Sequence, residues 1–167
     1  MRVVITGGTG LIGRALAADL VKDGHEVIVL TRNPANATDL PAGVRAVKWD
    51  GISSKGWEPS ADGADAIVNL AGESIAGNGF LPSRWTAVRK ERILTSRVNA
   101  GKAIVEAVTA AAIKPRVVIQ SSAVGYYGSQ DENSQPPLDE HAAAGNDFLA
   151  EVCKQWEDST AAVESMG

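Results

Sequence analysis

The chain has 167 residues, of which 44% are hydrophobic and 22% are charged, and its formal net charge is −4. These values are ordinary for one soluble globular domain with enough chain to bury a core. The negative charge and the absence of any basic run disfavour nucleic acid and anionic membranes as partners. No apolar run approaches the ~20 residues of a membrane span, and the single cysteine, Cys153, excludes an internal disulfide. We therefore expect a cytoplasmic protein, and we predict no metal site.

Residues 1–13 read MRVVITGGTGLIG and predict a strand, a glycine turn and the start of a helix. The β-branched run within Arg2–Thr6 is typical of a short buried strand, and the apolar residues after the turn recur at helical spacing. Gly7 permits a tight turn, Gly10 lets the backbone approach a pyrophosphate, and Gly13 lets helix and strand pack closely. This pattern predicts dinucleotide binding; the alternative is a purely structural turn.

The helix that follows the glycine turn supplies the phosphate contacts in this interpretation. The backbone N–H groups at its start, at Leu11 and Ile12, have no partner within the helix. They therefore face the phosphates, and the helix dipole adds to the attraction.

A second buried strand is expected at residues 26–31, and it ends beside a basic residue. About 20 residues after the glycines, an NAD-binding protein usually offers Asp or Glu to the ribose hydroxyls. Here Thr31 and Arg32 occupy that place and the acid is absent. A guanidinium would bind a 2′-phosphate with two charge-assisted hydrogen bonds, so we predict NADP(H) rather than NAD(H). The alternative is that Arg32 is a solvated loop charge.

Three more buried strands are expected, at residues 43–50, 64–70 and 116–120, with only a very short helix before the second of them. Asp50 ends the first and would accept a hydrogen bond from the adenine amino group. Buried strands that alternate with helices indicate a parallel sheet covered on both faces. We therefore predict a Rossmann-type, doubly wound α/β domain over residues 1–167.

The fourth strand leads into Asn69-Leu70-Ala71-Gly72, where small residues would let the backbone pass against the cofactor ribose. The alternative is a tight strand exit. A long helical region is then expected from Pro82 to Ala112. Its Arg97 would approach a cofactor phosphate, although most of the basic residues here would lie on a solvated helix face.

The segment SSAVGYYG, at residues 121–128, follows the fifth strand. In open α/β sheets ligands bind outside the carboxyl ends of the strands, so this is where chemistry is expected. A last helix, capped by Asn146 or Asp147 and continuing through Met166, completes the predicted elements.

These motifs together resemble the extended short-chain dehydrogenases/reductases, and more closely their atypical "epimerase family" branch. The residues that carry the resemblance are TGGTGLIG at 6–13, NLAGESIA at 69–76, Arg84-Trp85, Ser96-Arg97, SSAVGYYG at 121–128 and FLAEVCKQWE at 148–157. The resemblance implies a Rossmann-type fold with bound NADP(H) and a small polar substrate, such as a sugar nucleotide. Extended members continue into further strands and a C-terminal substrate domain, so we expect this chain to be the N-terminal portion of a longer protein.

The sequence departs from such enzymes where they carry a Tyr-x-x-x-Lys pair, because Ala150 stands four residues before Lys154. Ser122 could instead orient a carbonyl oxygen, and Tyr126 or Tyr127 could donate the proton; the alternative for the tyrosines is packing at the strand exit. Two functions stay open at this point: an NADP(H)-dependent oxidoreductase or epimerase, and a non-catalytic NADPH-binding sensor or scaffold. The sequence is compatible with a homo-oligomer but does not establish one.

Overall fold

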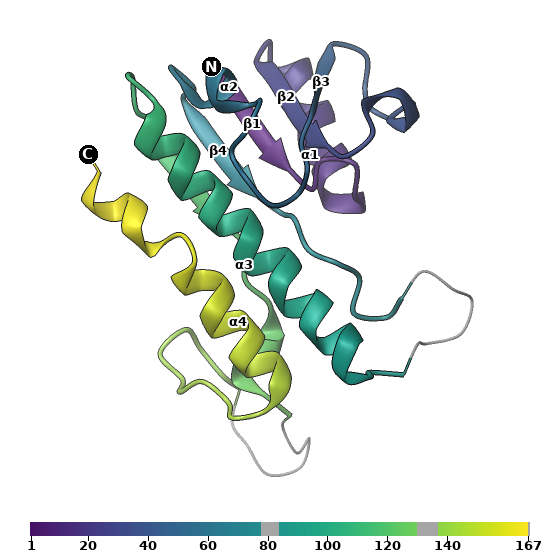
Figure 1. Cartoon of the computed structure of the whole chain (residues 1–167), viewed down its shortest axis with the longest axis vertical. Coiled ribbons are helices and arrows are strands. Elements are labelled where there is room, and N and C mark those ends of the chain that lie inside the picture. Colours follow the sequence, from purple (N-terminus) through teal and green to yellow (C-terminus); the bar gives the residue numbers. More distant parts are fainter. Residues whose placement is uncertain (78–83, 130–136, 167) are drawn as a thin grey trace.

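The structure, a computed structural model, describes residues 1–77, 84–129 and 137–166. Its centre is a five-stranded, wholly parallel sheet in the order β3-β2-β1-β4-β5 (Figure 1). The strands are β1 (Arg2–Thr6), β2 (Glu26–Thr31), β3 (Val44–Lys48), β4 (Ala66–Asn69) and β5 (Val117–Gln120). The chain builds outward from β1 to β3 and then crosses back to β4. The strand order therefore reverses between β1 and β4, which is where ligands bind in such sheets.

Helices cover both faces of the sheet. They are α1 (Leu11–Lys22), α2 (Glu58–Ala61), α3 (Ala87–Ala110) and α4 (Phe148–Asp158), and α4 lies alongside α3 in Figure 1. Short 3₁₀ turns occupy Pro34–Asn36, Val124–Tyr127 and Ala161–Ser165. No helix in the described ranges has both the length and the apolar character that a membrane crossing needs.

Two helix ends differ from the sequence prediction. The long helix begins at Ala87, because the Thr86 side chain caps it by accepting a hydrogen bond from the Arg89 amide; Pro82, the expected start, lies outside the described residues. The last helix is capped by Asp147 as expected but ends at Asp158 instead of Met166. The Ser159 hydroxyl donates to the Trp156 carbonyl at 2.6 Å, a local bond that competes with continued helix.

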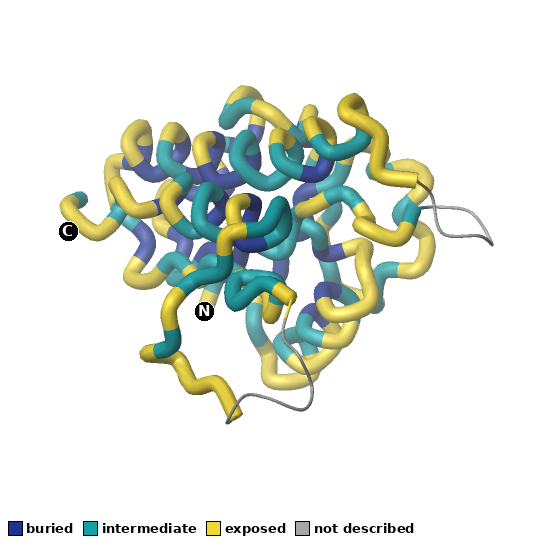
Figure 2. Tube along the Cα trace, turned by 90° about the horizontal axis from the view of Figure 1, so that it is seen from below, coloured by how far each residue is buried: buried dark blue, intermediate teal, exposed yellow. Residues whose placement is uncertain are grey.

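The alternation of side chains along β1 divides the core into two layers. Val4 faces the layer built with α2 and α3, where Trp57 and Ile104 are fully buried. Val3 and Ile5 face the opposite layer, which is built with α1. Figure 2 shows the buried residues running through the interior, with exposed residues around them. Burial on both faces explains why these strands read as continuous apolar runs.

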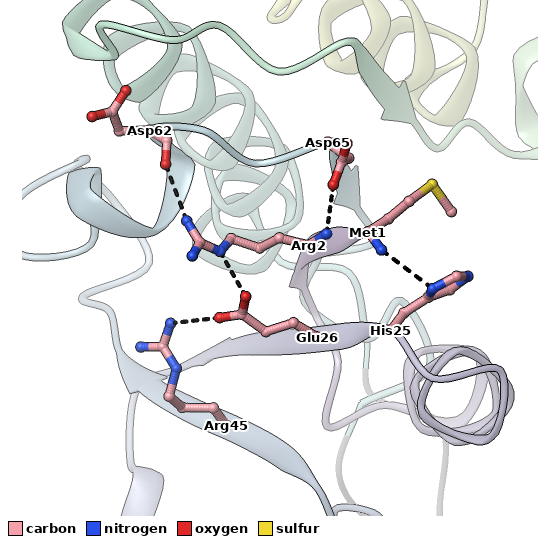
Figure 3. Close-up of polar contacts among 7 residues, drawn as sticks. All are labelled: Met1, Arg2, His25, Glu26, Arg45, Asp62 and Asp65. Carbon is pink, nitrogen blue, oxygen red and sulfur yellow. Dashed lines mark hydrogen bonds and ion pairs between the residues drawn. The ribbon is translucent and has the colours of Figure 1, made fainter.

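Figure 3 shows the amino edge of the sheet, where hydrogen bonds and ion pairs connect residues at the start of neighbouring strands. The Arg2 guanidinium donates to the Glu26 carboxylate at 2.9 Å and to the Asp62 carbonyl at 3.3 Å. Arg45 reaches the same Glu26 carboxylate at 3.5 Å, and Asp65 accepts from the Arg2 amide at 2.7 Å. This network ties β1, β2, β3 and the segment before β4 together at the edge away from the strand ends that build the site.

Candidate functional site

A groove with a volume of about 760 Å³ lies at the carboxyl edge of the sheet. The ends of β1, β2 and β4, the segment after β3 and one face of α3 form its walls. Most of the predicted cofactor residues line it together: Gly7, Gly10, Thr31, Arg32, Asp50, Leu70, Ala71 and Gly72. The fold therefore brings together segments that are distant in the sequence. Their binding of a cofactor stays a prediction.

The glycine turn forms the floor of this groove, and its geometry requires glycine. Gly7 has φ of +67°, and a Cβ there would lie 2.5 Å from the Leu70 carbonyl oxygen. A Cβ on Gly13, which is buried, would lie 2.6 Å from the Gly7 carbonyl oxygen. Gly13 therefore lets α1 pack closely against the glycine turn that follows β1, and it does not line the groove.

The amino end of α1 is open towards a ligand. Its N-cap residue is Gly10, and no side chain caps the helix. Leu11 and Ile12 do not line the groove, but their side chains are 83% and 70% exposed. A helix start with uncapped amides is a ready site for an anion.

The two residues that the sequence predicted to contact the adenosine end of the cofactor, Arg32 and Asp50, line the groove just after β2 and β3. Arg32 is exposed there and forms no ion pair with any described residue. Asp50 is engaged in its own loop, where it accepts from the Ile52 amide at 2.7 Å and from the Ser53 amide at 2.8 Å. These bonds, chiefly those from Ser53, lower the pKa of Asp50. Asp50 therefore shapes the wall of the groove in addition to its predicted adenine contact.

A buried hydrogen-bond network supports the groove from below. The Thr6 hydroxyl donates to Asn69 Oδ1 at 2.6 Å, and both residues are fully buried. Asn69 Nδ2 in turn donates to Gln120 Oε1 at 2.8 Å. Thr6 Oγ1 also accepts from the amides of Leu70 and Ala71, both at 3.2 Å. The three strands β1, β4 and β5 thereby fix the path of the backbone that lines the groove.

Arg97 is not among the residues that line the groove, although its guanidinium lies beside the groove residue Gly72, and its contact with a cofactor phosphate stays a prediction. Its guanidinium donates to the carbonyls of Glu73 at 3.1 Å and Ile93 at 2.9 Å, and it lies 5.0 Å from the Trp156 ring centroid. Burial lowers its pKa, and the Glu73 carboxylate opposes that shift. Arg97 thus connects the loop after β4 to α3 and α4 through contacts within the protein.

The sequence prediction missed the wall that α3 supplies. Its polar residues Arg92, Thr95, Ser96 and Asn99 all line the groove. Their spacing places them on one face of a helix, so the periodic signal was present in the sequence. A polar helix face is normally solvated, and for that reason alone it was not assigned to the site.

The predicted catalytic residues lie after β5, on the side of α4, and none of them lines the groove. Ser122 is exposed, and the rings of Tyr126 and Tyr127 meet edge to face with centroids 5.3 Å apart. Lys154 forms an ion pair with Glu151 at 2.9 Å. The bond to Glu151 is the main cause of its raised pKa. Ala150, at the usual tyrosine position, is fully buried.

Comparison with known proteins agrees with this architecture. Residues 3–150 match the model of the NAD dependent epimerase/dehydratase family. Epimerase family protein YfhF of Bacillus subtilis is 36% identical over 169 residues, which cover 100% of this chain and 52% of YfhF. The chain therefore spans about half the length of the curated relatives it matches.

Two solved structures are similar at the level of fold and sequence. Human epimerase family protein SDR39U1 (isoform 2), whose structure contains NADPH, is 30% identical with a TM-score of 0.73, covering 96% of this chain and 48% of that one. The nucleoside-diphosphate sugar epimerase from Corynebacterium glutamicum is 38% identical with a TM-score of 0.74, covering 99% and 31%. Given the match over residues 3–150, the chain belongs to the NAD-dependent epimerase/dehydratase family.

Proposed function

We propose that the protein binds NADP(H) in the groove and acts as an oxidoreductase or epimerase on a small polar substrate, such as a sugar nucleotide. The observation that carries the proposal is the glycine turn, where Gly7 and Gly10 bring bare backbone to a groove headed by the uncapped start of α1. Dinucleotide pyrophosphates bind in this setting. The NADPH in the human SDR39U1 structure supports the choice of cofactor.

The preference for the phosphorylated cofactor rests on Arg32. It lines the groove at the end of β2, where an NAD-binding protein would carry a carboxylate, and no described acid pairs with it. A 2′-phosphate would provide the missing partner and form charge-assisted hydrogen bonds with the guanidinium.

Calorimetric titration of the intact protein with NADPH and NADH tests this preference. We expect NADPH to bind at least about tenfold more tightly, and Arg32→Gln to remove most of that difference without weakening NADH. Arg116→Gln is a matched control, because Arg116 is an exposed arginine just before β5, at the other end of the strands. Equal affinity for the two cofactors in the wild type would overturn the preference.

The catalytic part of the proposal concerns residues 121–128. A bound nicotinamide supplies or accepts a hydride. Ser122 would orient a substrate carbonyl, and Tyr126 or Tyr127 would donate the proton to its oxygen. Tyr126 is the first candidate to test, because it lies close enough to Lys154 for a phenolate at Tyr126 to interact with the lysine ammonium. We expect most substrate contacts to come from parts of the protein outside these residues.

Turnover with NADPH tests the assignment of the tyrosines. We expect Tyr126→Phe to lower kcat by about a hundredfold or more, as loss of a general acid does, with little change in NADPH affinity. Tyr127→Phe is the neighbouring control. Unchanged rates in both variants would remove the tyrosines from the mechanism.

A second function, a cofactor-dependent sensor or scaffold without turnover, is favoured by one observation. The position of the usual catalytic tyrosine is Ala150, whose methyl side chain is fully buried and cannot transfer a proton. This alternative predicts tight NADPH binding with no NADPH consumption across a wide panel of carbonyl compounds. Steady oxidation of NADPH by any of them would contradict it.

A further inference from the structure

A second hollow, of about 260 Å³, adjoins the adenosine end of the groove. It shares Thr9, Thr31 and Arg32 with the groove and is also lined by Arg14, Asn33, Asn36, Ala37, Asp39 and Leu40. Two guanidinium groups therefore border one small polar cavity, next to the place where the 2′ position of a bound adenosine would lie. A charge density of this kind suits a phosphate monoester.

Arg14 comes to this cavity from the first turn of α1, directly after Gly13. Its Nη1 lies 3.3 Å from Oδ2 of Asp39, and the two side chains are 40% and 80% exposed. Arg14 thus stands over the cavity in an exposed ion pair, whereas Arg32 has no such partner among the described residues.

The loop that carries Asp39 is held against α1 by its neighbour. Leu40 is partly buried and packs against the core layer on the α1 side. The Leu40 amide also donates to the Ala37 carbonyl at 3.4 Å, which closes a turn around Asp39. Asp39 is therefore positioned by the packing of Leu40, and its carboxylate is placed to hold Arg14 when no ligand is bound.

We propose that Arg14 is a second specificity-determining residue for the 2′-phosphate of NADP(H), and that Asp39 holds Arg14 in reserve until the phosphate displaces it. This inference rests on the proposed function. A phosphate monoester carries a charge of about −1.5 to −2 at pH 7, so two guanidinium groups match it better than one. An exposed ion pair contributes little to stability, so breaking the Arg14–Asp39 pair costs little free energy. The charge-assisted hydrogen bonds from a phosphate to the guanidinium are stronger and offset that cost.

The pairing of Arg14 with Asp39 also predicts the direction in which a change at Asp39 shifts the affinity for the 2′-phosphate. Because Asp39 competes with the ligand for Arg14, removing its charge strengthens binding of the 2′-phosphate. If Arg14 and Asp39 only tethered the loop to α1, removing either side chain would change stability and leave the discrimination between phosphorylated and unphosphorylated ligands as it was.

The test uses adenosine 2′,5′-bisphosphate and adenosine 5′-monophosphate, which differ only in the 2′-phosphate, titrated calorimetrically into the intact protein at low ionic strength. We expect Arg14→Gln to lower the affinity for the bisphosphate about tenfold and the affinity for the monophosphate less than about twofold. Asp39→Asn is expected to strengthen the bisphosphate about threefold, and this gain disappears when Arg14→Gln is also present. Lys22→Gln and Asp19→Asn, exposed charge changes elsewhere on α1, serve as matched controls.

The outcomes separate this inference from the proposed function. Binding of the monophosphate by Arg14→Gln shows that the variant is folded. If Arg32→Gln removes the preference for the 2′-phosphate but Arg14→Gln does not, the inference is overturned and the proposed function stands. If Asp39→Asn weakens binding of the bisphosphate, Asp39 does not compete with the ligand for Arg14 and the inference is overturned. Failure of the wild-type protein to bind NADPH overturns both.

Discussion

The two edges of the sheet are built in opposite ways. At the amino edge, the Arg2 guanidinium is bonded to Glu26 and to the Asp62 carbonyl, and Glu26 is shared with Arg45 (Figure 3). At the carboxyl edge, Arg32 is exposed with no ion-pair partner among the described residues, and α1 starts without a side-chain cap. The amino edge therefore uses its charged groups in contacts within the protein, whereas the carboxyl edge leaves Arg32 and the amides at the start of α1 available to a ligand.

The source of stability also differs between the edges. The ion pairs of the amino edge are exposed, with side-chain exposures of 36% for Arg2 and 47% for Glu26, so each contributes little. The carboxyl edge is held by neutral hydrogen bonds beneath the groove, among fully buried groups such as Thr6 and Asn69. Unpaired buried polar groups are expensive, so changes under the groove should have the larger effects.

Gly7→Ala is expected to have the largest effect. A side chain at φ of +67° is strained, and its Cβ would lie 2.5 Å from the rigid Leu70 carbonyl oxygen. We expect the free energy of unfolding to fall by about 2–5 kcal/mol, and NADPH affinity to fall more than about tenfold. Chemical denaturation and calorimetry measure the two changes.

Gly24→Ala is the matched control for this substitution. Gly24 has φ of +79°, and a Cβ added there would meet nothing within 4 Å, so it isolates the conformational term. Its expected loss is about 1–2 kcal/mol, with no change in cofactor affinity. Equal losses in the two variants would show that the close approach of Gly7 to Leu70 does not matter.

Thr6→Val should have the next largest effect. The change keeps the shape but removes the acceptor for the Leu70 and Ala71 amides and the donor to Asn69. We expect a loss of about 2–3 kcal/mol in unfolding free energy, together with weaker cofactor binding as the groove wall loosens. Thr109→Val, which removes an exposed hydroxyl bonded within α3, should change stability by less than about 0.5 kcal/mol. A similar result for both variants would contradict the proposed role of the buried network.

Arg97→Gln separates a structural role from the phosphate contact that the sequence suggested. Loss of the bonds to Glu73 and Ile93 and of the stacking on Trp156 should lower stability by about 1–2 kcal/mol. NADPH affinity should stay within about twofold, unlike the loss of tenfold or more expected on removing a phosphate contact. Arg92→Gln on the same helix should do the reverse, since exposed Arg92 lines the groove. Denaturation and titration of both variants check this exchange of roles.

Much of the fold could be predicted because its signals are local. The second strand occupies residues 26–31 and the first helix ends at Lys22 before Gly24, as the apolar runs and the glycine indicated. The four-residue helix α2 also fits the short span that the sequence left for it. Buried parallel strands and glycine stops are encoded by neighbouring residues, so no tertiary knowledge is needed to find them.

The roles of the side chains in the site were harder to predict, because the long side chain of an arginine can reach partners that are distant in the sequence. Arg32 and Arg97 look alike in the sequence, yet one is exposed at the groove and the other donates to backbone carbonyls beside Trp156. The pairing of Arg14 with Asp39 joins a helix to a loop with no periodic relation between them. Such choices depend on which surfaces pack together, which a single sequence does not state.

The smallest expected effect is at the amino edge. The hydrogen bond from Arg2 is the main cause of the lowered pKa of Glu26, and the bond from Arg45 adds to it. A carboxylate with a lowered pKa in the folded state stabilises the protein above its unfolded pKa, about 4.3, and this contribution is lost as the pH falls through the folded value. Glu26→Gln should therefore reduce stability by less than about 1 kcal/mol at pH 7, as is usual for an exposed pair. The difference from wild type should shrink below about pH 4, because protonation then removes the same charge. Thermal unfolding of both proteins between about pH 3 and about pH 7 measures this difference in stability across the titration of Glu26. A difference that persists at the acid end would show that the shape of the side chain, and not its charge, holds this edge.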